Sequence, residues 1–380
     1  MAATVSWERL RELAAFRVEK GCAISLYVDL DPSETPTAGD AETRVNSLLA
    51  EGERSRGANR GELTHDQKQG LKADFDRIRT YVDQEFDRDG ARGLAVFSAG
   101  LDNVWRTLSL NEAVADEIRV AQDFYLTPLV PLLGRGDGAL VAVVGRERGV
   151  VYQLRGGRLE EVADHSEEQP GQHDQGGWSQ SRFKRHIDNL ASEHMRTVAD
   201  ELSRQARRLR DAGVVVVCAE EMRGEFGELL AHEVQKMLAG WTTAEAHASP
   251  ADLLEIVTPL LDEWRAGREA ATLERWREEA GRNGRASSGW EATLEAASDG
   301  RVEILLFREG TDRGAWRCPT CGRASVKGGS CPLDGTRMEE HDAGLDLAVH
   351  QTLAHGGSVC AVRYHQDLEP VEGIGALLRY

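Results

Sequence analysis

The spacing of apolar residues changes along the chain between the period of a strand and the period of a helix. Residues 22–30 (CAISLYVDL) and 214–219 (VVVVCA) are short apolar runs with the composition of buried strands. A longer stretch, residues 179–212, carries apolar side chains at helical spacing, at Phe183, Ile187, Leu190, Val198, Leu202 and Leu209. Because strands and helices alternate, the pattern predicts layered α/β domains.

The pattern divides into three blocks, predicted as domains over residues 1–134, 135–262 and 263–380. In the first block we expect helices at 6–16 (N-capped by Ser6), 41–55 and 64–86, and strands at 22–30, 92–100 and 104–110. In the second we expect a three-stranded meander over 139–164, the helix at 179–212, a strand at 214–221 and a helix at 224–240. In the third we expect helices at 252–279, 289–297 and 344–357, and strands at 302–307 and 358–364.

Charge and composition limit the classes of function. The chain has 380 residues, 41% of them hydrophobic, and a formal net charge of -18. This charge argues against a protein coated generally with nucleic acid, but a local basic surface remains compatible with selective RNA binding. The first 19 residues lack the apolar core of a signal peptide, and no apolar run reaches membrane-spanning length. We therefore expect a soluble cytoplasmic protein that binds neither membrane nor DNA.

The stretch with the most distinctive chemistry is residues 171–185, GQHDQGGWSQSRFKR. Gly176 and Gly177 allow the backbone to approach another surface closely. Gln180 offers an amide donor and acceptor that can orient a water molecule or stabilise an oxyanion, but it cannot act as a general base. The candidate RNA contacts are Trp178 as a stacking platform, Ser179 as an N-cap for the following helix, and Arg182, Lys184 and Arg185 as partners for phosphates.

A plainer interpretation of the same residues is a solvated loop before an amphipathic helix. A Gly-x-x-Gln pattern is expected by chance about once in a chain with ordinary glycine usage. His173 and His186 could be metal ligands or bases, but the favoured interpretation is that they are polar residues of the loop and of the helix. The residues alone leave these alternatives open.

The cysteines fall into two groups. Cys22, Cys218 and Cys360 lie in apolar runs and are expected to be buried strand residues. A Cys/Gly-rich insert over 313–337 contains Cys318, Cys321, Cys331 and Asp334 as a CxxC…CxxD pair, whose spacing suits a structural, tetrahedral Zn²⁺ site. His341 competes with Asp334 as the fourth ligand, and a ribbon that has lost its metal is the alternative.

The three-block order and the glycine pair before Gln180 resemble the archaeal and eukaryotic class 1 release factor superfamily, which includes Pelota. The segment QGGWSQSRFKR is most similar to the bacterial release-factor-like branch close to the Vms-type (ankyrin-and-zinc-finger) peptidyl-tRNA hydrolases. The ending VEGIGALLRY is similar to the end of the superfamily's third domain. The resemblance implies an RNase-H-like middle domain and an α/β/α sandwich as the C-terminal domain, with the zinc ribbon as an insert.

The resemblance also implies a role for the loop. Release factors carry a GGQ motif, whereas Trp178 and Ser179 intervene here, so the match is to the GxxQ form of the hydrolase branch. In that branch the glutamine is implicated in cleaving nascent chains from tRNA on stalled ribosomal subunits. The role carries over to Gln180 as the catalytic residue, with Gly176 and Gly177 as backbone determinants. No NIKS tetrad is found in the first block, so decoding of stop codons is not expected.

The leading hypothesis is a ribosome-associated peptidyl-tRNA hydrolase in ribosome rescue or quality control. Its expected partners are the large subunit or a stalled 70S ribosome and peptidyl-tRNA, with a translational GTPase as a further expectation of the resemblance. The alternatives are a non-catalytic, Pelota-like hibernation or stress factor that occupies the A site, and a nuclease that acts near the tRNA 3′ end. The sequence does not decide between them, nor does it determine the oligomeric state.

Overall fold

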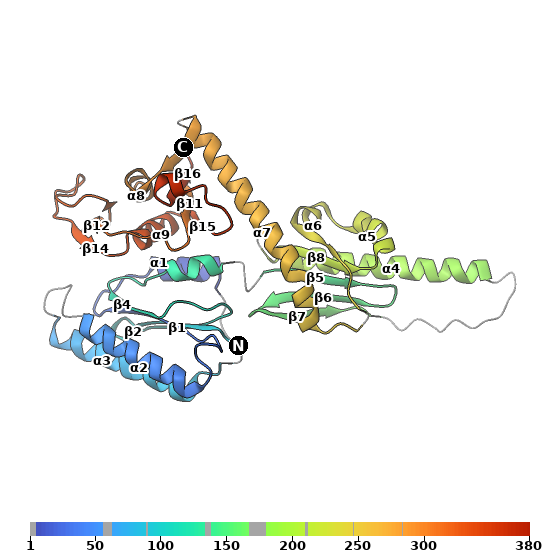
Figure 1. Cartoon of the computed structure of the whole chain (residues 1–380), viewed down its shortest axis with the longest axis horizontal. Coiled ribbons are helices and arrows are strands. Elements are labelled where there is room, and N and C mark those ends of the chain that lie inside the picture. Colours follow the sequence, from blue (N-terminus) through green and yellow to red (C-terminus); the bar gives the residue numbers. More distant parts are fainter. Residues whose placement is uncertain are drawn as a thin grey trace. The chain divides into compact units, whose positions relative to one another are not determined.

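The computed structural model describes residues 5–55, 63–88, 90–133, 138–166, 180–209, 212–245, 247–282 and 284–380. For residue 55 and residues 180–191 it describes only the backbone. The chain divides into two compact units, one formed by residues 1–133 with 269–380 and the other by residues 134–268. Several sheets, each covered by helices, confirm the predicted mixed α/β class (Figure 1). The division into three domains remains a prediction.

The N-terminal part of the first unit is an antiparallel four-stranded sheet in the order β3-β2-β1-β4. Its strands are β1 (Ala23–Asp29), β2 (Gly93–Ala99), β3 (Val104–Leu110) and β4 (Glu117–Ala121). Its helices are α1 (Trp7–Ala15), α2 (Ala38–Ser55) and α3 (His65–Thr80), the last continued by a π-helical turn at Tyr81–Glu85. Ser6 caps α1 as predicted, accepting a hydrogen bond from the Arg9 N–H. Figure 1 shows α2 and α3 together on one face of the sheet, where they cover Ile24 and Leu26.

The C-terminal part of the first unit is a sheet in the order β10-β16-β11-β15. Its strands are β10 (Ala286–Ser288), β11 (Val302–Arg308), β15 (Ser358–Val362) and β16 (Ile374–Leu378), and its helices are α8 (Trp290–Ser298) and α9 (Gly344–Ala354). Alternate side chains of β11 point to opposite faces, so that Leu305 packs with α8 and α9 while Leu306 packs with Trp276 of α7 (Pro250–Gly281). This arrangement confirms the predicted α/β/α sandwich.

The two sheets of the first unit share one hydrophobic core. Leu10 and Leu13 of α1 belong to the same cluster of buried residues as Leu345 and Val349 of α9. The first and last thirds of the sequence therefore fold against each other. Such contacts have no signal in local periodicity, because they join residues that are distant along the chain.

The second unit contains a five-stranded sheet in the order β7-β6-β5-β8-β9. Its strands are β5 (Leu140–Val144), β6 (Gly149–Arg155), β7 (Arg158–Asp164), β8 (Val214–Cys218) and β9 (Leu238–Thr242). Strand β6 is antiparallel to both its neighbours, whereas β8 is parallel to β5 and to β9. These are the order and directions expected of an RNase-H-like sheet. One face is covered by α4 (Gln180–Ala206), α5 (Arg223–Leu229) and α6 (His232–Met237), and the other by the first part of α7.

One predicted element was wrong in the second unit. Residues 224–240 were expected to form a single helix, but extended backbone at Leu230 and Ala231 separates α5 from α6, and the last residues form β9. Pairing with β8 satisfies the backbone groups of β9, and Trp241 packs edge-on against Phe226 with ring centroids 6.3 Å apart. Tertiary pairing thus overrides a locally helical pattern.

Two smaller expectations concern burial and membrane association. Cys218 is buried as predicted, whereas Cys22 and Cys360 are half-buried. Within the described ranges, no helix is both long enough and apolar enough to cross a membrane.

Candidate catalytic helix and metal centre

The predicted catalytic loop lies mostly outside the described residues. Gly176, Gly177, Trp178 and Ser179 all fall there, as does His173. Gln180 is the first residue of α4. The three basic residues of the prediction lie in the first turns of α4, where only the backbone is described: Arg182, Lys184 and Arg185. The roles proposed for all of these residues therefore remain predictions.

Helix α4 is held against the sheet by its second half. Its buried apolar residues recur at helical spacing: Met195, Val198, Ala199, Leu202 and Ala206. They pack with Leu140 and Ala142 of β5 and with Val216 of β8. The helix ends at Ala206 rather than at residue 212, because the last turn tightens into bonds from Arg208 and Leu209 to carbonyls three residues back. The second half of α4 is therefore anchored in the core, and Gln180 lies at the opposite end of the same helix.

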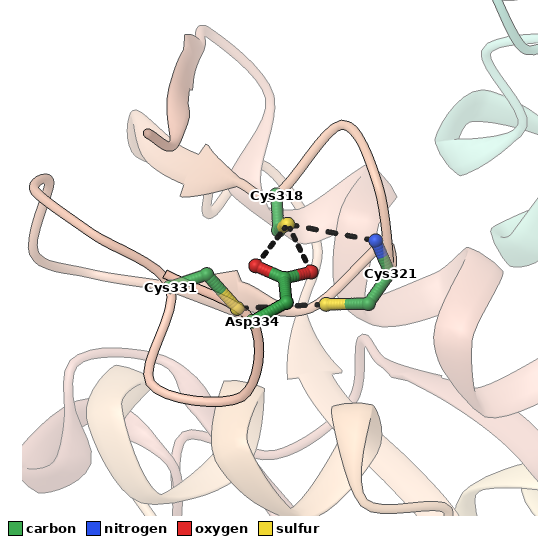
Figure 2. A group of neighbouring side chains, drawn as sticks. All are labelled: Cys318, Cys321, Cys331 and Asp334. Atoms are coloured by element: carbon green, nitrogen blue, oxygen red, sulfur yellow. Dashed lines mark hydrogen bonds between the residues drawn. The ribbon is translucent and has the colours of Figure 1, made fainter. Parts of the chain in front are cut away.

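The four predicted metal ligands come together beside a small three-stranded sheet, on the segments that connect its strands. Its strands are β12 (Ala315–Arg317), β13 (Ala324–Ser325) and β14 (Glu339–His341), in the order β13-β12-β14. One ligand atom from each of Cys318, Cys321, Cys331 and Asp334 lies within 4.8 Å of the others. Figure 2 shows the four side chains directed toward one another.

The two ligand pairs lie on turns with the same hydrogen bonds. The Gly322 N–H donates to the Cys318 carbonyl at 2.9 Å, and the Gly335 N–H donates to the Cys331 carbonyl at 2.9 Å. Both glycines have positive φ, +78° and +73°, a conformation that side-chain-bearing residues rarely adopt. The glycine after each ligand pair is therefore required by the turn, which explains the repeated CPxxG spacing.

The separations between ligand atoms fit tetrahedral coordination. The Cys321 and Cys331 sulfurs are 3.5 Å apart, and the Cys318 sulfur is 3.4 and 3.6 Å from the two Asp334 oxygens. Zinc–ligand bonds of about 2.3 Å to sulfur and about 2.1 Å to oxygen would separate tetrahedral ligands by about 3.6–3.8 Å. The residues present thus fit a metal ion, and a set rich in thiols favours a soft or borderline one.

Local hydrogen bonds prepare Asp334 to act as a ligand. The Thr336 N–H donates to Asp334 Oδ1 at 2.9 Å, and this bond is the largest cause that lowers the pKa of the Asp334 carboxyl to about 2. Asp334 is consequently ionised at neutral pH. Thr336 was missed in the sequence because nothing in the CxxD spacing identifies the residue that orients the carboxylate.

His341, the competing fourth ligand, has a different environment. It is the last residue of β14, paired with Ala315, and its Nδ1 accepts a hydrogen bond of 3.3 Å from the Ala343 N–H. Among the described residues, the four-ligand group contains Asp334 and does not contain His341.

The first ligand turn is attached to the body of the unit. The Gln351 amide of α9 donates to the Gly322 carbonyl at 2.8 Å, and Arg323 pairs with Asp299 at 2.6 Å. The second turn is exposed, with Leu333 at its tip 68% accessible. Gln351 could not have been found from the sequence, since it lies outside the Cys-rich insert.

The fold and these sites define a class of α/β protein. One unit is RNase-H-like and carries the long helix α4, which starts at Gln180. The other unit carries the pair of turns with the three cysteines and Asp334. Residues 125–259 match the family model described as "Bacterial archaeo-eukaryotic release factor family 10". This match covers the second unit as far as residue 259 and includes Gln180.

Two curated relatives, each named "Peptide chain release factor subunit 1", are similar over more of the chain. That of Archaeoglobus fulgidus is 30% identical over 234 residues, which is 57% of each chain. That of Thermococcus onnurineus is 25% identical over 294 residues, or 69% of this chain and 71% of the relative. The chain thus spans little more than half the length of the first relative. A solved structure of Archaeoglobus fulgidus Pelota is 14% identical with a TM-score of 0.34, covering 100% of this chain and 94% of that one.

These matches confirm the predicted resemblance to the release factor superfamily. The finer assignment to the Vms-type hydrolase branch remains a prediction.

Proposed function

We propose that this protein is a ribosome-associated factor that hydrolyses peptidyl-tRNA, acting in the cytoplasm in ribosome rescue or quality control. The observation that carries the proposal is the family match over residues 125–259, which contains the Gly-Gly-x-x-Gln loop and all of α4. The relatives' name, peptide chain release factor, supports hydrolysis of the ester between a peptide and tRNA as the reaction. Stop-codon decoding is not part of the proposal.

In this proposal Gln180 positions the attacking water molecule on the ester carbonyl. An amide is sufficient because the aminoacyl ester is already activated and the ribosome supplies the remaining environment. Gly176 and Gly177 let the backbone approach the tRNA end, and Trp178 stacks on an unpaired base. Ser179, Arg182, Lys184 and Arg185 contact the RNA backbone.

The partners in this proposal are the large subunit or a stalled 70S ribosome carrying peptidyl-tRNA. A translational GTPase is a further proposed partner, on the strength of the resemblance. No role for DNA or a membrane is proposed.

We also propose that Cys318, Cys321, Cys331 and Asp334 hold a structural Zn²⁺. The matching turns at Gly322 and Gly335 and the ligand separations of 3.4 to 3.6 Å support this. Bound zinc would cross-link the two turns, and four protein ligands would leave no position for substrate. The role of these residues is then to stabilise the insert.

The decisive experiment is release of a labelled nascent peptide from 50S–peptidyl-tRNA complexes, with the tRNA resolved on a gel. We expect wild type to release the peptide and leave full-length tRNA, and Gln180→Ala to bind the same complexes without release. The matched control is Gln175→Ala, which removes another glutamine of the same loop and should retain release.

Each other result identifies a different function. Release accompanied by shortened tRNA would indicate a nuclease. Tight binding without release by wild type would indicate a non-catalytic occupant of the A site. Loss of binding in Gln180→Ala would show that this residue is a contact rather than the catalytic group.

A further inference from the structure

Gly149, the first residue of β6, lies against helix α4. A Cβ atom added there would be 2.5 Å from Val198 Cγ2 and 2.7 and 2.8 Å from Cε1 and Nε2 of His194. Real Cβ atoms essentially never make contacts this short. The backbone of Gly149 does not have positive φ, so the glycine is required by the helix above it rather than by its own conformation.

The Gly149 backbone also forms hydrogen bonds with the two residues that follow β7. The His165 N–H donates to the Gly149 carbonyl at 2.7 Å, and the Gly149 N–H donates to Ser166 Oγ at 3.3 Å. His165 and Ser166 are the last described residues before α4 begins at Gln180. The end of β7 is therefore hydrogen-bonded to Gly149, and α4 packs against the same residue.

A second contact joins the end of β7 directly to α4. His165 Nε2 lies 3.8 Å from Glu201 Oε2, and the Glu201 side chain is only 5% exposed. Glu201 is held in turn by the Gln205 amide at 2.7 Å and by an ion pair with Arg204. The 3.8 Å separation is longer than a hydrogen bond, so the position of α4 is defined by the close packing at Gly149, with Glu201 and the end of β7 beside it.

His194 shows that this packing is unusually tight. Its side chain is 4% exposed, and its Nε2 atom is buried without a hydrogen-bond partner. A buried nitrogen with no partner is unfavourable, so no hydrogen bond at Nε2 holds the ring there and its contacts are those of packing. His194 and Val198 both belong to α4, and together they fill the space between the helix and the Gly149 backbone.

We propose that Gly149 is a positioning residue, which sets the register of α4 on the sheet and thereby the place of Gln180. This inference rests on the proposed function of Gln180. Gln180 precedes His194 by fourteen residues, about 21 Å along the helix. A rigid helix transmits a shift at its anchored half to its first residue.

The test variant is Gly149→Ala. The added methyl group needs about 1 Å more space to reach an ordinary carbon–carbon separation of about 3.5 Å. Misplacement of a catalytic group by about 1 Å can lower a rate by about 10²-fold. We therefore expect the single-turnover release rate at saturating ribosome complex to fall by about 10²-fold while the affinity for the complex is unchanged.

Two further variants separate positioning from folding. Gly145→Ala is the matched control, since its Cβ would meet nothing nearer than 3.6 Å and release should be unaffected. The double variant Gly149→Ala with Val198→Ala removes the nearest obstructing atom, leaving only the movable His194 ring, and should recover much of the rate. Hydrogen exchange of the α4 amides supplies a readout without catalysis: protection should fall in Gly149→Ala and return in the double variant.

The outcomes distinguish this inference from the proposed function. If wild type shows no release, the proposed function fails, and hydrogen exchange alone decides whether Gly149 sets the register of α4. Wild-type release and wild-type protection in Gly149→Ala would overturn the inference. Equal losses of release and ribosome affinity, or no recovery in the double variant, would also overturn it, because Gly149 would then serve folding only.

Discussion

Asp346 Oδ1 accepts a hydrogen bond of 2.8 Å from the backbone N–H of Leu126, a residue 220 positions earlier in the chain. The same oxygen accepts from the N–H and the hydroxyl of Thr127, both at 3.1 Å. Beside it, His350 Nε2 lies 2.6 Å from the Phe124 carbonyl oxygen. These contacts attach α9 to the segment that follows β4, so the first and last thirds of the chain are joined by polar bonds as well as by apolar packing.

Loss of the Asp346 carboxylate should destabilise the first unit. Asp346 is 5% exposed and Leu126 is fully buried, so Asp346→Ala would leave the buried Leu126 N–H unpaired, at a cost of about 1–3 kcal/mol. We expect the urea unfolding midpoint, followed by circular dichroism, to fall clearly.

The control is Asp346→Asn, whose amide oxygen can still accept. It should lose less stability than Asp346→Ala, and equal losses in the two variants would show that charge rather than hydrogen bonding is responsible.

If Asp334 is the fourth ligand of a bound zinc ion, two substitutions of this residue should change zinc retention in opposite directions. Asp334→Cys should increase zinc retention in the presence of a chelator, because thiolate is the commoner ligand of structural zinc. Asp334→Ala should lower retention, as measured by zinc content after dialysis against the chelator.

His341→Ala is the matched control and should retain zinc as wild type does. If His341→Ala lost zinc while Asp334→Ala kept it, the fourth ligand would be His341, and the arrangement in Figure 2 would not be the metal-bound one.

The carboxyl group of Asp31 should make the stability of the fold depend on pH. The Ser33 N–H, followed by the Arg92 guanidinium and the Ser33 hydroxyl, lowers the pKa of the Asp31 carboxyl to about 2. Because this folded pKa is below the unfolded value of about 3.9, the ionised group stabilises the fold above about pH 4. That contribution is lost as the pH falls from about 4 to about 2.

Asp31→Asn should therefore have a lower thermal midpoint than wild type at pH 7, with a gap that narrows between about pH 4 and pH 2. Ser33→Ala removes only the hydroxyl donor and should show a smaller gap over the same range. A gap that does not change with pH would contradict this role for the charge.

The basic residues at the start of α4 should act through electrostatics. Replacing Arg182, Lys184 and Arg185 together with alanine should weaken ribosome binding and make it less sensitive to salt. Each lost phosphate contact reduces the slope of log affinity against log salt by about 0.7–0.9.

A variant with three other arginines replaced provides the comparison: Arg204 lies in the last turn of α4, and Arg207 and Arg208 follow its end. An equal change of slope in both variants would argue against a specific RNA contact at the start of the helix.

Much of the fold could be predicted because its signals are local. The apolar run that forms β1, the valine run that forms β8 and the N-cap at Ser6 each depend on residues close together in the sequence. The group of four candidate metal ligands could be predicted for the same reason, since Cys318 and Cys321 lie on one turn and Cys331 and Asp334 on another. The residues of the proposed catalytic loop were indicated only through a resemblance.

Other features were decided by tertiary structure alone. Strand β9 forms because β8 offers backbone partners, which outweighs the helical pattern of its residues. Asp346 and Leu126 meet because two sheets share a core, and no local pattern records a contact across 220 residues. The sequence pattern alone predicts Gly149 to be an ordinary turn residue. The need for a glycine at this position appears only in the folded structure, where α4 packs over it. The sequence by itself determined most of the elements and the two turns of the candidate metal site, whereas long-range packing determined strand β9 and which elements meet, because periodicity depends only on neighbouring residues.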